Sequence, residues 1–427
     1  MMSKLALLGG EPVLTELPPP YPSIGPAEIQ AVEHVTKSGC LSGFYGSWSN
    51  EFFGGPVVRE FEAAWRERFD TKHAISVNSA TSGLIAAMGA IGVSPGDEVI
   101  VPPLTMSATA MAPLLYGGIP VFADVEAQTF CLDSAAVRTA ISERTKAILA
   151  VNLFGHPAAL IELRAIADEF DLYLVEDNAQ APLATDGGQY TGTVGDIGVF
   201  SLNYHKHIHT GEGGMCVTDD DDLAQRLQLI RNHGENVVES LEISDITNLI
   251  GFNFRLTELS AAVGIEQLRR IDEHVERRCE LAESLTETTT GMIGLTTPFV
   301  RSECTHVYYV WSLRIHAEEL GVSRELFSNA LRAEGFPHGV GYCRPLYMLP
   351  LFQQQCAIGR DGFPFHLGSR NYGPGLCPVA ERLFHDELII FEPCAYGINE
   401  RLTKQLGFAL EKVYENRHEL MPEGRAA

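Results

Sequence analysis

Basic residues are scarce in this chain of 427 residues, and lysine is the scarcer kind, with only seven positions. Acidic residues outnumber lysine plus arginine by 55 to 31, which gives a formal net charge of -24. A chain with this charge and without a run of basic residues repels the phosphates of nucleic acids and of anionic lipids. We therefore expect neither nucleic acid nor a membrane surface as a partner.

Paired cysteines and long apolar runs are also missing. The nine cysteines are an odd number and none belongs to a Cys-x-x-Cys pair, so we expect neither a disulfide framework nor a metal site. The apolar run from Leu5 to Leu8 is too short for a secretory signal, and no later run reaches the length of a membrane span. Hydrophobic residues make up 45% of the chain, enough for two or three domains of a cytoplasmic protein.

What the chain does contain, from about residue 73 to residue 231, is an alternation of short β-branched apolar runs with longer amphipathic stretches. This alternation is typical of βαβ units in a mostly parallel sheet flanked by helices. The expected strands are 73–77, 98–101, 120–125, 147–153, 172–176, 198–202 and 214–218. The expected helices are 82–91, 107–116, 134–141, 158–170 and 221–231.

The segment 257–287 has the periodicity of a helix and a dense charged face. We interpret it as the helical connection out of the large domain, with a smaller α/β domain after it. The boundary is placed near residue 275, which gives a large cofactor-binding domain with an N-terminal arm over 1–275 and a small C-terminal domain over 276–427.

The stretch from Phe200 to Gly214 is the most informative about the chemistry of the protein. Lys206 lies within it, between an expected strand and a glycine-rich turn that leads into the next strand. A side chain at such a place projects from rigid elements into a cleft. A lysine between two histidines is nevertheless more often a solvated or structural residue. The chemical interpretation therefore depends on three other segments.

Residues 78–83 join a strand to a helix, where free backbone N–H groups and hydroxyls can hold a phosphate, although such residues also cap ordinary helices. Residues 175–180 end a buried strand with Asp177 at the edge where open α/β sheets bind ligands. Its carboxylate can keep a pyridine nitrogen protonated or, equally, cap the loop or pair with an arginine. Residues 251–258, taken alone, predict a helix entry capped by Asn253 or Thr257.

Taken together, these segments resemble the sugar aminotransferase family named DegT/StrS, within the fold-type I pyridoxal phosphate enzymes. The resemblance covers most of the chain. It is carried by Gly96 to Pro102, Val175 to Gln180, Gly195 to Ser201, Thr210 to Gly214, Arg231 to Gly234 and Gly251 to Arg255. It implies an α/β fold with a large domain on a mostly parallel sheet, a smaller C-terminal α/β domain, and pyridoxal 5'-phosphate as the cofactor.

The resemblance also implies the catalytic roles. Lys206 carries the cofactor as a Schiff base and moves the α-proton of the donor, Asp177 pairs with the ring nitrogen, and Gln180 approaches the phenolic oxygen of the ring. The expected donor is L-glutamate or L-glutamine, and the reaction should be ping-pong.

The phosphate of the cofactor has its own set of implied partners. Ala80, Thr81 and Ser201 match the positions that bind it. Asn253 matches a residue that family members contribute to the phosphate across a dimer interface, which implies a homodimer with two shared sites. The chain departs from the family at Met106, which occupies the place of an aromatic side chain that stacks on the ring; a polarisable thioether can cover a ring face.

A sister branch of the family removes a sugar hydroxyl and carries histidine in place of the lysine. Here Lys206 has the aminotransferase spacing to Ser201 and to Gly211, whereas a shift of one residue would bring His205 or His207 to the cofactor. We therefore expect transamination and keep sugar dehydration as an alternative. A regulatory protein without turnover is a further alternative, against which the presence of both an imine-forming lysine and a ring-nitrogen carboxylate argues.

The acceptor is left open by the sequence. The family acts on nucleotide-linked keto sugars, our first expectation, and on cyclitol ketones of aminoglycoside-type pathways, the alternative. Tyr342, Arg344 and Tyr347 resemble a segment that returns to the mouth of the active site, although the tyrosines can equally pack under a Pro-rich loop. His233 and Arg255 are candidate substrate contacts with the same ambiguity.

Overall fold

The computed structural model describes residues 3–421, and its largest element is a seven-stranded sheet between two layers of helices. Strands β8, β5, β4, β2 and β3 are parallel neighbours in this order, while β9 runs antiparallel between β8 and β1. The expected α/β fold with a mostly parallel sheet is confirmed. The strands are β1 (His73–Val77), β2 (Glu98–Val101), β3 (Ile119–Phe122), β4 (Thr145–Val151), β5 (Tyr173–Asp177), β8 (Ile197–Ser201) and β9 (Gly214–Thr218).

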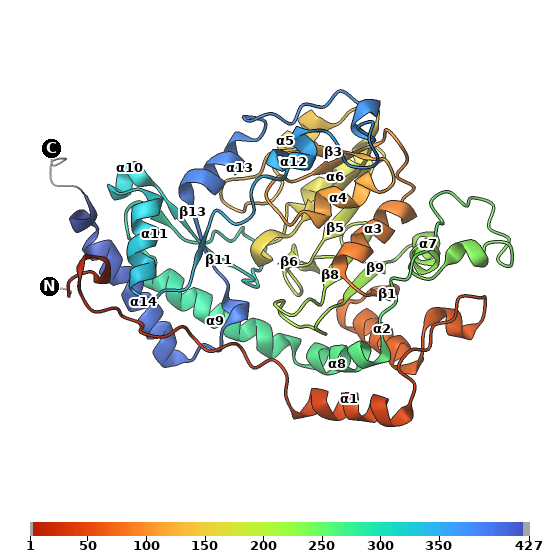
Figure 1. The fold of residues 1–427 in the computed structure, drawn as a ribbon, viewed down its shortest axis with the longest axis horizontal. Helices are drawn as coiled ribbons and strands as arrows, with labels where there is room; N and C mark the ends of the chain where they lie inside the picture. The colour runs from red at the N-terminus through yellow and green to blue at the C-terminus, as the bar shows by residue number, and fades with distance from the viewer. Residues whose placement is uncertain (1–2, 422–427) are drawn as a thin grey trace.

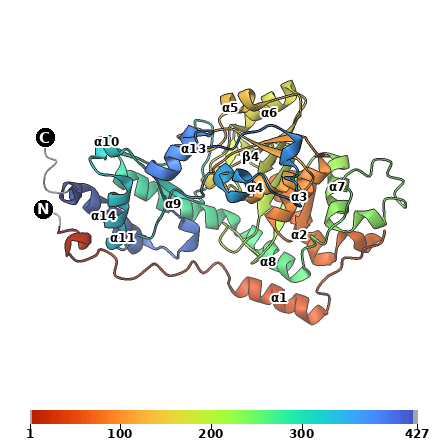
Figure 2. The same ribbon diagram turned by 45° about the horizontal axis from the view of Figure 1, so that its top comes forward.

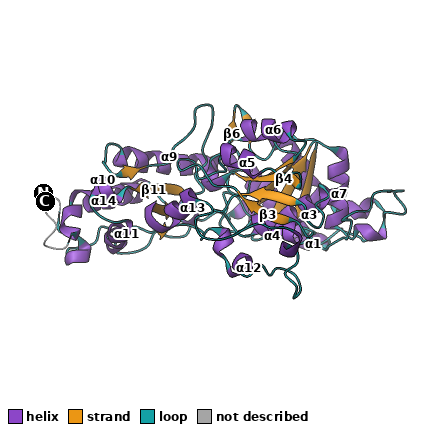
Figure 3. Ribbon diagram, turned by 90° about the horizontal axis from the view of Figure 1, so that it is seen from above, coloured by secondary structure: helices purple, strands orange, loops and turns teal. Residues whose placement is uncertain are grey.

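Helices cover both faces of this sheet, as the view from above shows (Figure 3). Along β1 the faces alternate, because Ala74 belongs to the core under α2 and Val77 to the core under α3. A Cβ at Gly83 would lie 2.7 Å from the side chain of Val199, so this glycine lets α3 lie close against β8. These helices are α2 (Pro56–Phe69), α3 (Ala80–Ala90), α4 (Ala108–Leu114), α5 (Ser134–Ala140), α6 (Leu160–Glu169), α7 (Asp221–Arg231) and α8 (Glu258–Arg269).

A second, antiparallel sheet of four strands lies in the other part of the molecule, in the order β10-β11-β13-β12 (Figure 1). Its core includes Trp311, Phe327 and Leu410. The strands are β10 (Leu295–Thr296), β11 (Trp311–Ile315), β12 (Gly339–Val340) and β13 (Leu388–Phe391). The helices that follow β10 are α10 (Ala317–Leu320), α11 (Arg324–Ala333), α12 (Pro350–Gln353), α13 (Pro378–Arg382) and α14 (Glu400–Glu415).

The helical connection expected over 257–287 consists of two helices, α8 and α9 (Ile271–Thr289), with Arg270 between them at φ -110° and ψ 10°. The boundary near residue 275 falls inside α9 and stays a prediction, as does the division into 1–275 and 276–427. Packing crosses this division in both directions. Leu5 and Leu14 belong to the core of the second sheet, and Tyr347 and Phe352 belong to the core of the large sheet.

The N-terminal segment runs along one edge of the molecule, from the second sheet to α1 (Pro26–Ser38), which lies beside α8 (Figures 1 and 2). On the way it forms an isolated β-bridge between Pro20 and Tyr396, and the amide of Tyr21 donates to the carbonyl of Ala395 at 3.2 Å. Over residues 3–421, no helix is long and apolar enough to cross a membrane.

Candidate active site

The residues expected to carry chemistry gather at the C-terminal edge of the parallel strands. Asp177 is the last residue of β5 and Ser201 the last of β8, and the two strands are parallel neighbours. Lys206 lies in the loop after β8, which is closed at its base by a hydrogen bond from Leu202 N to Gly213 O at 2.9 Å. The lysine and the carboxylate therefore meet at the edge where open α/β sheets bind ligands.

Lys206 lines a cavity of about 420 Å³. His205 also lines this cavity, whereas His207 is fully buried and its Nε2 lies 2.7 Å from the carbonyl oxygen of Val307. The lysine, and not the histidine after it, thus reaches the cavity. Other lining residues come from the N-terminal segment, from the loop before β11 and from the end of β13; among them are Tyr21, Ser23, Tyr309 and Glu392.

Burial shifts the pKa values of Lys206 and Asp177 in opposite directions, because it favours the neutral form of each group. It lowers the pKa of the Lys206 amine to about 8, and the negative charge of Asp177 partly opposes this shift. Asp177 is 5% exposed, and burial raises the pKa of its carboxyl against the hydrogen bonds that it accepts. Thr109 Oγ1 donates to one carboxylate oxygen at 2.8 Å, and Ala179 N donates to the other at 3.2 Å.

Both the oxygen and the nitrogen of the Gln180 side-chain amide form hydrogen bonds. Its Oε1 accepts a hydrogen bond from Phe154 N at 2.8 Å, and its Nε2 donates to the hydroxyl of Tyr342 at 2.8 Å. Tyr342 has a left-handed backbone (φ 61°), uncommon for a residue other than glycine, and its ring packs edge-on against that of Phe154. The amide of Gln180 therefore has a fixed orientation just beyond Asp177 at the end of β5.

The first turn of α3 forms a cradle beside the end of β8. Ser79 caps the helix by accepting from Ser82 N at 3.0 Å, which leaves the amides of Ala80 and Thr81 without an intrahelical acceptor. A Cβ at Gly214, the β9 partner of Ser201, would lie 2.7 Å from Ala80 N, so only glycine lets these backbones approach. Such a turn suits a phosphate. With the buried carboxylate of Asp177 and the amine of Lys206 at the same edge of the sheet, the residues fit pyridoxal phosphate.

Of two further candidates, Asn253 borders this cradle and Met106 lies in the loop before α4. Asn253 is exposed, and its backbone oxygen accepts from Asn78 Nδ2 at 3.3 Å, just before the cap of α3. Met106 lies between β2 and α4 and is 58% exposed, so its side chain is free to lie against a ligand. Thr109, about one helical turn further on, is the residue that donates to Asp177.

The candidate substrate residues are not all brought together. Tyr347 is 0% exposed, and its hydroxyl donates to Glu381, which favours the alternative that it packs in the core. Arg344 is exposed. His233 and Arg255 lie outside the lining of the Lys206 cavity, and the side chains of both lie near Gly46.

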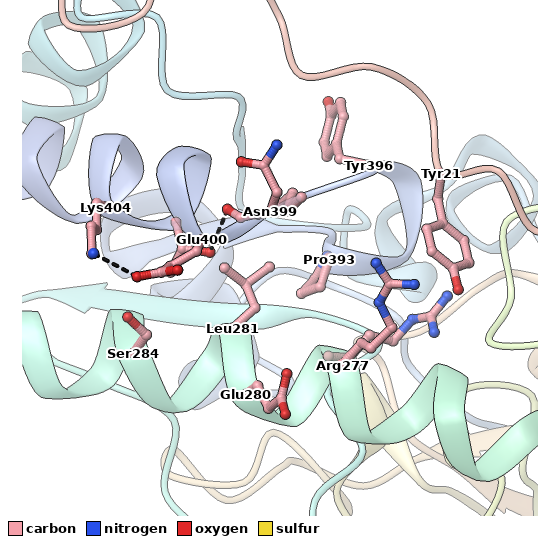
Figure 4. Close-up of a pocket in the computed structure, with 13 residues that line it drawn as sticks. Tyr21, Arg277, Glu280, Leu281, Ser284, Pro393, Tyr396, Asn399, Glu400 and Lys404 are labelled. Carbon is pink, nitrogen blue, oxygen red and sulfur yellow. Dashed lines mark hydrogen bonds and ion pairs between the residues drawn. The ribbon is translucent and has the colours of Figure 1, made fainter.

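A neighbouring cavity of about 410 Å³ shares Tyr21 with the Lys206 cavity (Figure 4). Its lining comes from α9, from the segment after β13 and from the start of α14, and includes Arg277 and an ion pair between Lys404 and Glu400 at 2.6 Å. Arg277 lies over the ring of Tyr21, 5.6 Å from its centroid. The N-terminal segment thus borders two cavities of similar size.

Sequence reasoning missed three residues of the site. Thr109, Tyr309 and Glu392 approach Asp177 or Lys206 only through the fold, from α4, from the loop before β11 and from the end of β13. A rule that looks for polar residues at the ends of strands would have found Glu392, which directly follows β13. The other two carry no such signal.

Comparison with known proteins agrees with this geometry. Residues 9–365 match the DegT/DnrJ/EryC1/StrS aminotransferase family. The chain is 35% identical over 433 residues to L-glutamine:2-deoxy-scyllo-inosose aminotransferase of Micromonospora echinospora, covering 98% of this chain and 100% of that protein. It is 34% identical over 326 residues to GDP-perosamine synthase of Caulobacter vibrioides, covering 74% and 86%.

Among solved structures, DesI in the presence of its TDP-sugar product is similar with a TM-score of 0.81 at 27% identity, covering 97% of each chain. The similarity extends over both sheets, because it includes nearly the whole chain. The protein therefore belongs to the DegT/DnrJ/EryC1/StrS aminotransferase family and is a pyridoxal phosphate-dependent enzyme of fold-type I.

Proposed function

We propose that this aminotransferase moves an amino group from L-glutamine or L-glutamate to a nucleotide-linked keto sugar or, alternatively, to a cyclitol ketone, with Lys206 as the reactive amine. The observation that carries the proposal is the position of this amine, in a cavity at the strand edge and beside the buried charge of Asp177. The two relatives support both acceptor classes, since the name of one contains a cyclitol ketone and that of the other a nucleotide sugar.

The proposed roles follow from the environment of each group. When bound, pyridoxal phosphate supplies a carbonyl for covalent attachment and a ring that withdraws electrons. The Lys206 amine, with its pKa lowered to about 8, is neutral often enough near neutral pH to attach and to take and return a proton. Asp177, held by Thr109, presents its charge to the ring nitrogen. Gln180 presents its fixed amide to the phenolic oxygen.

Ala80, Thr81 and Ser201 are proposed to hold the phosphate, through the free amides of α3 and a hydroxyl. We propose that Asn253 serves the neighbouring copy in a homodimer, which its exposure beside the α3 cradle supports. All nine cysteines are free, which supports a cytoplasmic location.

Among the candidate contacts, Met106 is proposed to cover one face of the ring and Tyr342 to fix Gln180. Arg344 is exposed and available to a substrate carboxylate or phosphate. His233 and Arg255 remain candidates for the outer part of an acceptor, and Tyr347 is the weakest candidate because it is buried.

The test is the visible absorption spectrum of the purified protein, before and after addition of L-glutamine or L-glutamate. Wild type should show the band of bound cofactor, and the donor should bleach it. Lys206→Ala should lose the donor response, whereas Lys404→Ala, which removes an exposed lysine of the neighbouring cavity, should keep it.

The alternatives give different outcomes. A protein that binds the cofactor but responds to no amino donor would favour sugar dehydration. A wild-type protein that binds no cofactor when supplied with it would contradict the enzymatic function and favour a regulatory role.

A further inference from the structure

The Lys206 cavity contains a carboxylate without a partner. Glu392 directly follows β13 and lines both this cavity and a second one of about 410 Å³, to which Arg332 and His338 also contribute. Within the part of the chain that the structure describes, no hydrogen bond or ion pair reaches its carboxylate oxygens, whereas Glu387, just before β13, is paired with Arg314 and Arg382. Only the charge of Lys206 favours the ionised form of Glu392.

An unpaired, partly buried carboxylate costs stability, because it loses water without gaining a donor. Burial accordingly raises the pKa of Glu392. Attachment of the cofactor to Lys206 would also remove the free ammonium that partly compensates this charge. Such a cost is typical of groups whose hydrogen-bond partner is a bound ligand.

The rest of the lining indicates which ligand suits this carboxylate. Burial lowers the pKa of His205 to about 4 and also lowers that of His209, so both imidazoles are neutral near neutral pH. Tyr21 and Ser23 add hydroxyl groups, which also pair with His274 and His209. An acceptor with several hydroxyl groups can donate hydrogen bonds to the carboxylate of Glu392 and to these neutral groups, whereas a ketone without hydroxyl groups cannot.

We propose that Glu392 is a specificity-determining residue, whose carboxylate accepts hydrogen bonds from hydroxyl groups of the acceptor and favours a polyhydroxylated ketone over a ketone without hydroxyl groups. This rests on the proposed function. The carboxylate orients the ketone toward the reactive amine and takes no part in the covalent steps.

The experiment uses the holoenzyme after conversion to its amino form by L-glutamine. The return of the absorption band is followed with 2-deoxy-scyllo-inosose, with a TDP-linked keto sugar and with pyruvate. Glu392→Leu should lower the rate constant for the better polyhydroxylated ketone by roughly 10- to 100-fold, as for a lost hydrogen bond to a charged group, and should not lower that for pyruvate. The rate constant of Glu392→Gln for the same ketone should lie between those of wild type and Glu392→Leu.

The matched control is Glu400→Gln, which removes a charge from the neighbouring cavity and should leave all three rate constants unchanged. Equal effects of Glu392→Leu on every acceptor, or no effect, would overturn the role of Glu392. So would a wild type that prefers pyruvate. Absence of the donor half-reaction in wild type would instead contradict the proposed function itself.

Discussion

The amine of Lys206 lies over the ring of Tyr309, with Nζ 4.3 Å from the ring centroid. A desolvated cation over an aromatic face gains about 2 kcal/mol, so the ring favours the protonated amine. Burial favours the neutral amine and lowers the pKa of Lys206 to about 8. The strength of this base is therefore set by burial, which favours the neutral amine, and by the ring and the charge of Asp177, which favour the ammonium.

The first prediction concerns pH. In cofactor-stripped protein, the rate of covalent attachment of pyridoxal phosphate should rise with pH through a midpoint of about 8, because only the neutral amine attacks. An ordinary lysine, with a pKa of 10.5, would still be almost fully protonated there. The measurement is the growth of the visible band after mixing at a series of pH values. A rate that keeps rising far above the expected midpoint would contradict the effect of burial.

The second prediction separates the effect of the Tyr309 ring on the pKa of Lys206 from the effect of burial. Tyr309→Leu removes the aromatic face and should lower this midpoint by about 1.5 pH units, since the ring contributes about 2 kcal/mol and about 1.4 kcal/mol corresponds to one unit. Tyr309→Phe keeps the face and should leave the midpoint near that of wild type. Equal midpoints in all three proteins would show that the ring does not stabilise the ammonium.

Much of the fold could be predicted from the sequence because its strands are buried on both faces. β1, β2 and β9 have the expected bounds, since a short apolar run between turns has few other ways to be buried. The connection over 257–287 is helical as expected, but its division into α8 and α9 was not predicted, because nothing in the charged pattern marks the break at Arg270.

The candidate site could be proposed from the sequence only where its residues lie next to each other in sequence or match a family segment. Lys206, Asp177 and Gln180 are of this kind. Tyr309 and Glu392 reach the lysine from the far end of the chain, and contacts over such separations depend on packing that no local pattern encodes.

The third prediction concerns the shared site. If Asn253 serves the neighbouring copy, Lys206→Ala and Asn253→Ala each disable both sites of a homodimer, but a mixed dimer has one site with neither change. Mixing the two inactive variants under conditions of subunit exchange should therefore restore donor-dependent bleaching. A mixture as inactive as its components would argue against a site shared in this way.

The fourth prediction concerns the anchor of the N-terminal segment. Glu334 is buried and accepts hydrogen bonds from Ala6 N at 2.8 Å and from Lys412 Nζ at 2.8 Å. Glu334→Leu should lower the free energy of unfolding by about 3–5 kcal/mol, because it leaves a buried ammonium unpaired. The double variant with Lys412→Met should recover part of this loss in urea denaturation at fixed cofactor concentration. Additive losses would contradict the pairing.

The last prediction concerns the hydrogen bond from Thr109 to Asp177, 2.8 Å long. Thr109→Val keeps the shape but removes the donor, and burial then raises the pKa of the carboxyl further. The carboxylate charge at the ring nitrogen weakens, so the donor half-reaction should slow by roughly 10- to 100-fold, as for a hydrogen bond to a charged group. Thr109→Ser keeps the hydroxyl and should remain close to wild type. If valine and serine slow the bleaching equally, the effect comes from packing and not from the hydrogen bond, and Asp177 needs no donor to hold its charge.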